Sequence, residues 1–137
     1  MATLAELGTY LQAQGVGTRA TDIWEGILPD EADDAADPDL FLLLYGSWQP
    51  PEHDLGQETT RLEFPAVQVL CRGTVFADVQ TMITDAFEEL VKIGGRETLS
   101  GVAYLAIEAQ QQPYQIEIDT RRRWVWGFNV YITKEPS

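Results

Sequence analysis

One amphipathic helix constrains the fold of this 137-residue chain more than any other feature. Between about residues 75 and 93, apolar side chains recur at helical spacing and form a wide stripe opposite a charged face. The stripe consists of Phe76, Val79, Ile83, Ala86, Phe87 and Leu90. The segments on either side have the two-residue alternation of strands. Because such a helix must bury one broad face, we expect it to pack on a sheet, in an α+β arrangement.

The remaining segments complete this arrangement. A first helix is predicted over about residues 3–14, where Thr3 and Glu6 have capping-box spacing and leucines recur at helical spacing. Strands are predicted over residues 23–28, 40–45, 67–72, 102–107, 114–119 and 124–133. The run 40–45 lacks alternation, which is typical of a strand covered on both faces. The order predicts one domain over residues 1–137, with a single twisted, mostly antiparallel sheet and two helices packed on one face.

Acidic charge dominates the composition. The net charge is −13, of which residues 1–69 carry −11 and residues 70–137 carry −2. A protein that grips nucleic acid needs cationic surface, so this function is excluded as the main one. The hydrophobic content of 45% is ample for a packed core and argues against disorder.

The scarce residue types exclude several enzyme classes. Cys71 is the single cysteine, which excludes an intramolecular disulfide and a cysteine-based zinc site, and we expect it in the core. His53 is the single histidine and lies in a loop without any G-x-S-x-G motif, so we expect a solvated loop residue. No catalytic residue, metal site or cofactor is predicted. A small hydrolase that uses two of the 22 carboxylates stays an alternative.

Membrane insertion and secretion are not expected. The N-terminus lacks a basic segment followed by a long apolar one. The longest apolar run, residues 40–45, is far shorter than the roughly 20 residues of a membrane-spanning helix. We therefore expect a protein made in a cytosol-like compartment.

Residues 30–39 form the most acidic stretch of the chain. Its carboxylates are Asp30, Glu31, Asp33, Asp34, Asp37 and Asp39. An EF-hand register starting at Asp30 fails, because alanine stands where glycine is needed and phenylalanine where the last glutamate is needed. The stretch is predicted to be a solvated loop, with weak cation binding as the alternative.

Two features suggest contacts with other proteins. Arg121, Arg122 and Arg123 are predicted either to form a charged hairpin turn or to pair with carboxylates of another subunit. A nucleic-acid role for them is weaker, given the net charge. Trp48 lies in a proline-rich loop, where it either anchors an interface or packs on its own loop.

The chain as a whole resembles the tail terminator proteins of long-tailed bacteriophages, which are also called minor capsid or tail completion proteins. The resemblance depends on the order and spacing of several segments, none of which is a catalytic signature. They are the leucine-seamed first helix, Ile23-Trp24-Glu25-Gly26-Ile27-Leu28-Pro29, Asp37-Pro38-Asp39, Leu44-Tyr45-Gly46, Phe64-Pro65-Ala66-Val67-Gln68-Val69 with Arg72-Gly73, and Gly127-Phe128-Asn129-Val130.

This resemblance implies a structural virion protein made in the host bacterial cytoplasm. It implies a hexameric ring at the head–tail junction that caps the tail tube, stops its polymerisation and joins the tail to the head. The implied partners are further copies of the chain, the tail tube protein and the head–tail connector protein, while DNA passes through the pore without specific binding. Arg121, Arg122, Arg123 and Trp48 are then expected at subunit or partner contacts, and the acids of residues 30–39 at the lumen or an interface. A head–tail adaptor that does not end the tube is the alternative.

Overall fold

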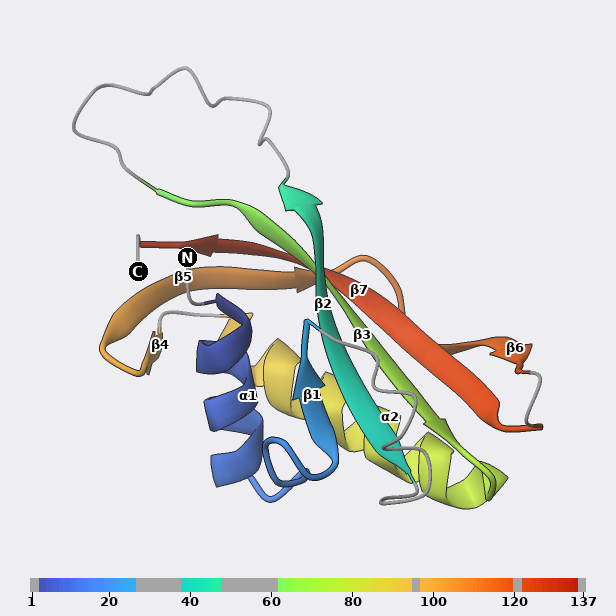
Figure 1. The fold of residues 1–137 in the computed structure, drawn as a ribbon. Coiled ribbons are helices and arrows are strands. Elements are labelled where there is room, and N and C mark those ends of the chain that lie inside the picture. Colours follow the sequence, from blue (N-terminus) through green and yellow to red (C-terminus); the bar gives the residue numbers. More distant parts are fainter. Residues whose placement is uncertain (1–2, 27–37, 48–61, 95–96, 120–121, 136–137) are drawn as a thin grey trace.

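The computed structural model describes residues 3–26, 38–47, 62–94, 97–119 and 122–135. Within these ranges, one curled sheet of seven strands has two α-helices packed on its concave side (Figure 1). No helix in these ranges is long and apolar enough to cross a membrane.

The first helix and first strand lie where the sequence predicts them. Helix α1 spans Thr3–Ala13, and its apolar seam is buried at Leu7 and Leu11. Strand β1 spans Ile23–Glu25 and is shorter than predicted, because Gly26 leaves the extended conformation with a φ of 83°. The rest of that predicted strand, residues 27 and 28, lies outside the described residues.

The sheet is built around its longest strand, β7 (Trp124–Lys134). One edge of β7 pairs with β3 (Pro65–Gly73), which pairs in turn with β2 (Asp39–Ser47) and through it with β1. The other edge of β7 is shared by β6 (Tyr114–Ile118), at the start of β7, and β5 (Val102–Ala109), at its end. Only the β1–β2 pair is parallel among the described strands, which confirms the predicted α+β fold class. The short edge strand β4 (Glu97–Leu99) was not predicted.

The concave side of the sheet carries the core. Helix α2 (Phe76–Val91) packs its apolar stripe there, as predicted, and a 3-10 turn, η3 (Lys92–Gly94), follows it. The rings of Phe87 and Phe128 meet edge to face with centroids 5.2 Å apart. The Tyr10 hydroxyl donates to the Glu89 carbonyl across 3.1 Å, which ties the two helices together. Cys71 is fully buried among these residues, as expected.

Strand β2 departs from the prediction that it is covered on both faces. Leu40, Phe41 and Leu42 are buried, but Leu44 and Tyr45 are 44% and 49% exposed. The strand passes beyond the helices at this point (Figure 1), and its register with β3 shifts between Leu44 and Gly46. The apolar run therefore ends in exposed surface rather than in a second layer.

Candidate assembly surface

The turn between β6 and β7 is the arginine-rich segment. The Asp119 amide donates to the Arg123 carbonyl and the Arg122 amide donates to the Asp119 carbonyl, each across 2.9 Å. The Arg123 guanidinium binds the Asp119 carboxylate with Nε 2.7 Å from Oδ2, and its side chain is only 11% exposed. Arg123 therefore stiffens its own turn.

Arg122 has a different environment from Arg123. Its backbone has a positive φ of 62°, and the residue is exposed. Its side chain makes no hydrogen bond or ion pair with any part of the chain that the structure describes. Arg121 lies outside the described residues. Arg122 is thus the described arginine of this turn whose charge is available to a partner.

Strand β6, which leads into this turn, is an exposed apolar edge. It pairs with β7 alone among the described strands, so its other edge has no strand partner there. Tyr114, Ile116 and Ile118 are 40%, 40% and 51% exposed. An unpaired edge with large apolar side chains is a template for contact with another chain. The sequence predicts this strand, but the spacing of its residues does not indicate that one edge of the strand is left uncovered.

Aromatic side chains extend the exposed surface on the concave side of the hairpin. Phe76, at the start of α2, meets the rings of Trp124 and Trp126 edge to face, with centroids 5.0 and 5.7 Å away. Phe76 is itself 39% exposed. A shallow pocket beside it is lined by Ile118, Arg122 and Trp124. We call the side chains of Ile118, Arg122 and Trp124, which line this pocket, the hairpin surface.

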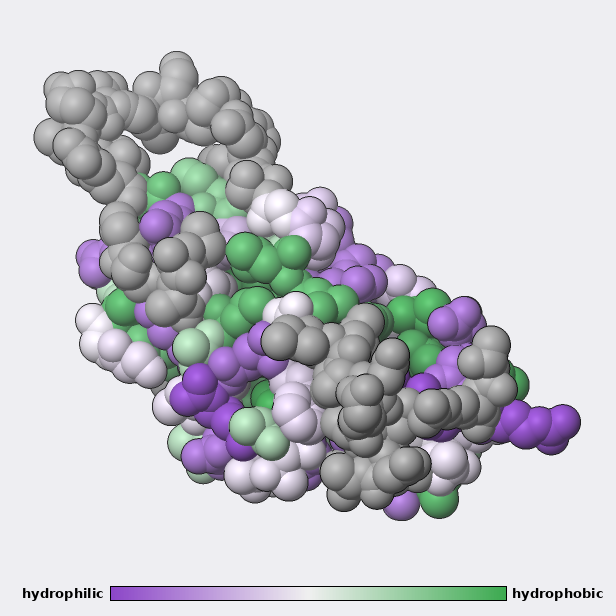
Figure 2. Space-filling model, in the orientation of Figure 1, coloured by the Kyte–Doolittle hydropathy of each residue, from purple (hydrophilic) through white to green (hydrophobic). Residues whose placement is uncertain are grey.

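On the outer side of the hairpin, a glycine controls the packing. A Cβ on Gly127 would lie 2.6 Å from Leu70 Cδ2, 2.8 Å from the Val69 carbonyl oxygen and 3.1 Å from Ile116 Cδ1. Only glycine therefore lets Leu70 and Ile116 close over β7 at this point. Figure 2 shows apolar side chains across the middle of the visible face of the molecule, with hydrophilic side chains at their borders.

Three tyrosines occupy the same outer face, close to the exposed half of β2. Burial, and to a smaller extent the phenols of Tyr131 and Tyr114, raises the pKa of Tyr45. The Tyr45 hydroxyl also donates to Gln110 Oε1 across 3.1 Å. The raised pKa keeps the Tyr45 phenol neutral at physiological pH, so this surface offers a hydrogen-bonding hydroxyl beside apolar rings.

Asp39, which lies in the described part of the acidic stretch, is buried inside the fold. Asp39 begins β2, stands opposite Arg72 in the register and is only 2% exposed. Its Oδ2 lies 3.7 Å from Arg72 Nε, and the Arg72 guanidinium stacks 4.5 Å from the centre of the Phe41 ring. Asp39 therefore contributes no negative surface, unlike the expectation for the stretch. The other five acids, Trp48 and His53 lie outside the described residues.

A negatively charged surface region lies on α2. Asp78 and Asp85, together with Asp22 from the turn before β1, line a shallow groove. Val16, Pro38 and Met82 line the same groove and supply apolar surface. We call this the acidic groove. The sequence places Asp78 and Asp85 on the charged face of the helix, but the contribution of Asp22 depends on tertiary packing. No group of three or more described His, Cys, Asp or Glu side chains is placed to hold a metal ion.

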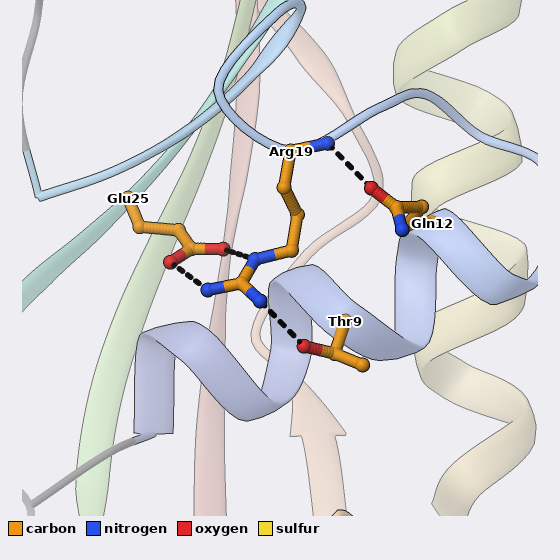
Figure 3. Close-up of polar contacts among 4 residues, drawn as sticks. All are labelled: Thr9, Gln12, Arg19 and Glu25. Carbon is orange, nitrogen blue, oxygen red and sulfur yellow. Dashed lines mark hydrogen bonds and ion pairs between the residues drawn. The ribbon is translucent and has the colours of Figure 1, made fainter.

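The β1 edge of the sheet is covered by the turn that precedes this strand. Ile23 donates to the Thr18 carbonyl and its own carbonyl accepts from Ala20, so the preceding turn covers β1. Figure 3 shows how Arg19 fixes this turn: Nε and Nη2 bind the two carboxylate oxygens of Glu25 at 2.6 and 3.0 Å, and Nη1 donates to Thr9. These bonds to Glu25 raise the pKa of Arg19. β1 is thus protected against strand addition, whereas β6 is open.

A buried polar cluster has the residue types of a catalytic site but is sealed. Lys134 Nζ lies 3.2 Å from Glu6 and 3.3 Å from Glu63, and the Tyr104 hydroxyl donates to Glu6 Oε1 across 2.6 Å. Lys134 also donates to Thr3 Oγ1, so the two residues predicted as a capping box are joined to the end of β7. Burial first, and then Glu6, raises the pKa of Tyr104. Since Lys134 and Tyr104 have no exposed surface, we assign the cluster a structural role.

A small α+β fold with a protected edge at β1, an open edge at β6 and apolar surface on both sides of a hairpin is typical of proteins that work within assemblies. The chain belongs to the bacteriophage tail terminator protein family, whose sequence pattern matches residues 10–136. This match confirms the resemblance predicted from the sequence. The protein is therefore a structural component of the phage virion that interacts with other tail or head proteins. No curated protein matches the chain significantly.

Proposed function

We propose that copies of this chain close into a ring, with six as the expected number, that caps the phage tail tube. The ring ends polymerisation of the tube and joins the tail to the head–tail connector. The observation that carries this proposal is the family match over residues 10–136. The ring acts by shape and contact, without catalysis or a cofactor.

The described surfaces support a head-to-tail contact between copies. The hairpin surface and the acidic groove share no residue, and a contact between two different patches repeats around a ring when its rotation closes. The net charge of −13 suits a ring through which DNA slides, because negative surface repels phosphate. We propose that Asp30, Glu31, Asp33, Asp34 and Asp37 supply part of that charge, and that Trp48 docks on a neighbour.

A tube-assembly assay tests the terminating role. Purified tail tube protein is polymerised with and without the chain, and tube lengths and tube ends are recorded by electron microscopy. We expect shorter tubes of narrow length distribution, with a ring of copies at one end. Tubes that carry the chain but keep growing would instead identify a head–tail adaptor. Tubes that never bind the chain would overturn the proposal.

A further inference from the structure

The open edge of β6 points to a specific partner. In the described part of the sheet, β1 is covered by its own turn, while β6 exposes three large apolar side chains and an unpaired backbone edge. Proteins commonly protect such edges with charge, proline or a covering segment. Glu117 is the one charged residue within β6. The hairpin surface therefore has the composition of an interface that another chain covers.

We propose that this occupant is a second copy of the same chain, whose acidic groove receives the hairpin surface. The inference rests on the proposed ring and names the contact that builds it. Ile118 and Trp124 bury apolar surface against the neighbour, and Arg122 pairs with its Asp22, Asp78 or Asp85.

Charge complementarity selects a second copy as the occupant. Arg122 carries an exposed guanidinium without a partner among the described residues, in a chain of net charge −13. The acidic groove combines three carboxylates with the apolar side chains of Val16, Pro38 and Met82. Arginine fits such a groove because its guanidinium binds carboxylates in pairs while its methylene stem packs on apolar atoms.

The internal contacts of the hairpin favour this geometry. Asp119 holds Arg123 inside the turn and leaves the exposed position to Arg122. A turn fixed in this way loses little conformational entropy when it docks. Arg123 is ion-paired with Asp119 and only 11% exposed, so we assign the pairing with the neighbour to Arg122.

Sedimentation velocity over a range of protein concentrations tests the proposal, first on the wild-type chain and then on two variants. Arg122→Glu places like charges at the contact, and Ile118→Lys places a charge in its apolar part. Each should weaken self-association by about tenfold or more. The matched controls are Lys92→Glu, which makes the same charge change at an exposed lysine of η3, and Leu44→Lys, at an exposed apolar residue of β2. Neither control should weaken self-association, and far-ultraviolet circular dichroism checks that all variants fold.

A charge exchange identifies the receiving surface. Chains with Arg122→Glu, Asp78→Lys and Asp85→Lys together should recover self-association that Arg122→Glu alone loses, because the ion pairs are rebuilt with reversed sign. Lack of recovery would overturn the assignment of the groove.

Two further outcomes separate this inference from the proposed function. If both hairpin variants self-associate like the wild type and still end tubes, the hairpin contact is wrong while the terminator role stands. If they self-associate normally but no longer bind tubes, the occupant is the tail tube protein rather than a second copy. A wild-type chain that stays monomeric in solution and on tubes would overturn both proposals.

Discussion

Replacing Lys134 by methionine tests the buried polar cluster that joins the two ends of the fold. The side chain is fully buried, and its Nζ lies 3.2 Å from Glu6 and 3.3 Å from Glu63 and Thr3 Oγ1. Methionine has similar length and fills the same space without a charge. The substitution therefore removes the ion pairs with Glu6 and Glu63, the hydrogen bond to Thr3 and the cation–π contact with the Tyr104 ring, while leaving no large cavity.

The expected cost follows from the burial of the two carboxylates. Removing one member of a buried ion pair costs about 3–5 kcal/mol, because the remaining charge has no compensation. Glu6 is only 5% exposed, whereas the side chain of Glu63 is 24% exposed and partly solvated. We therefore expect Lys134→Met to lower the free energy of unfolding by about 3 kcal/mol, at the low end of this range. For a chain of this size, the loss corresponds to a fall in Tm of about 10 °C.

Urea unfolding followed by tryptophan fluorescence measures this cost. The matched control is Lys92→Met, because Lys92 also lies 3.2 Å from a glutamate, Glu89, but is 67% exposed. The control should lose less than about 0.5 kcal/mol. The double variant Lys134→Met/Glu6→Gln should recover roughly half of the loss, since the uncompensated charge is removed. A loss below about 1 kcal/mol for Lys134→Met, or a double variant less stable than the single one, would refute the reasoning.

Three further predictions concern packing, pH and thiol reactivity. Gly127→Ala should destabilise the fold by about 1–3 kcal/mol in urea unfolding, because its Cβ meets the Val69 carbonyl at 2.8 Å. Gly8→Ala should cost less than about 1 kcal/mol, since the clashing atom is the end of the Glu25 side chain, its displacement loses only a partly exposed ion pair with Arg19, and alanine favours the helix; equal costs would contradict this argument. The pKa of Tyr104 is raised above its ordinary 10.0, so the folded state keeps the phenol proton that the unfolded state loses. The contribution of this phenol to the free energy of unfolding should be fully present below pH 10 and decrease as the pH rises beyond it. Unfolding curves at several pH values should show a smaller decrease for Tyr104→Phe than for the wild type. Cys71 should react with a thiol reagent only in denaturant, because it is fully buried; rapid reaction of the native protein would show that the sheet opens there.

The sequence alone predicted the features that depend on local spacing. The apolar stripe of α2, the leucine seam of α1 and the alternation that turns Val67, Val69 and Cys71 toward the core all follow from periodicities of 3.6 and 2 residues. The order of these segments was also sufficient for the resemblance to tail terminators, which the family match confirms.

Tertiary structure decided how individual polar residues are used. Asp39 and Arg72 are 33 positions apart in the sequence but opposite each other in the sheet, so a residue of the acidic stretch became an internal ion pair. Glu6 has the spacing of a capping residue, but it accepts a hydrogen bond from Tyr104 of β5 and forms an ion pair with Lys134 of β7. The two-residue alternation of β6 would be the same whether or not another element covered the strand, so the sequence could not show that its edge is open. Local spacing fixes which way a side chain points, whereas burial and pairing depend on which distant segments fold against it.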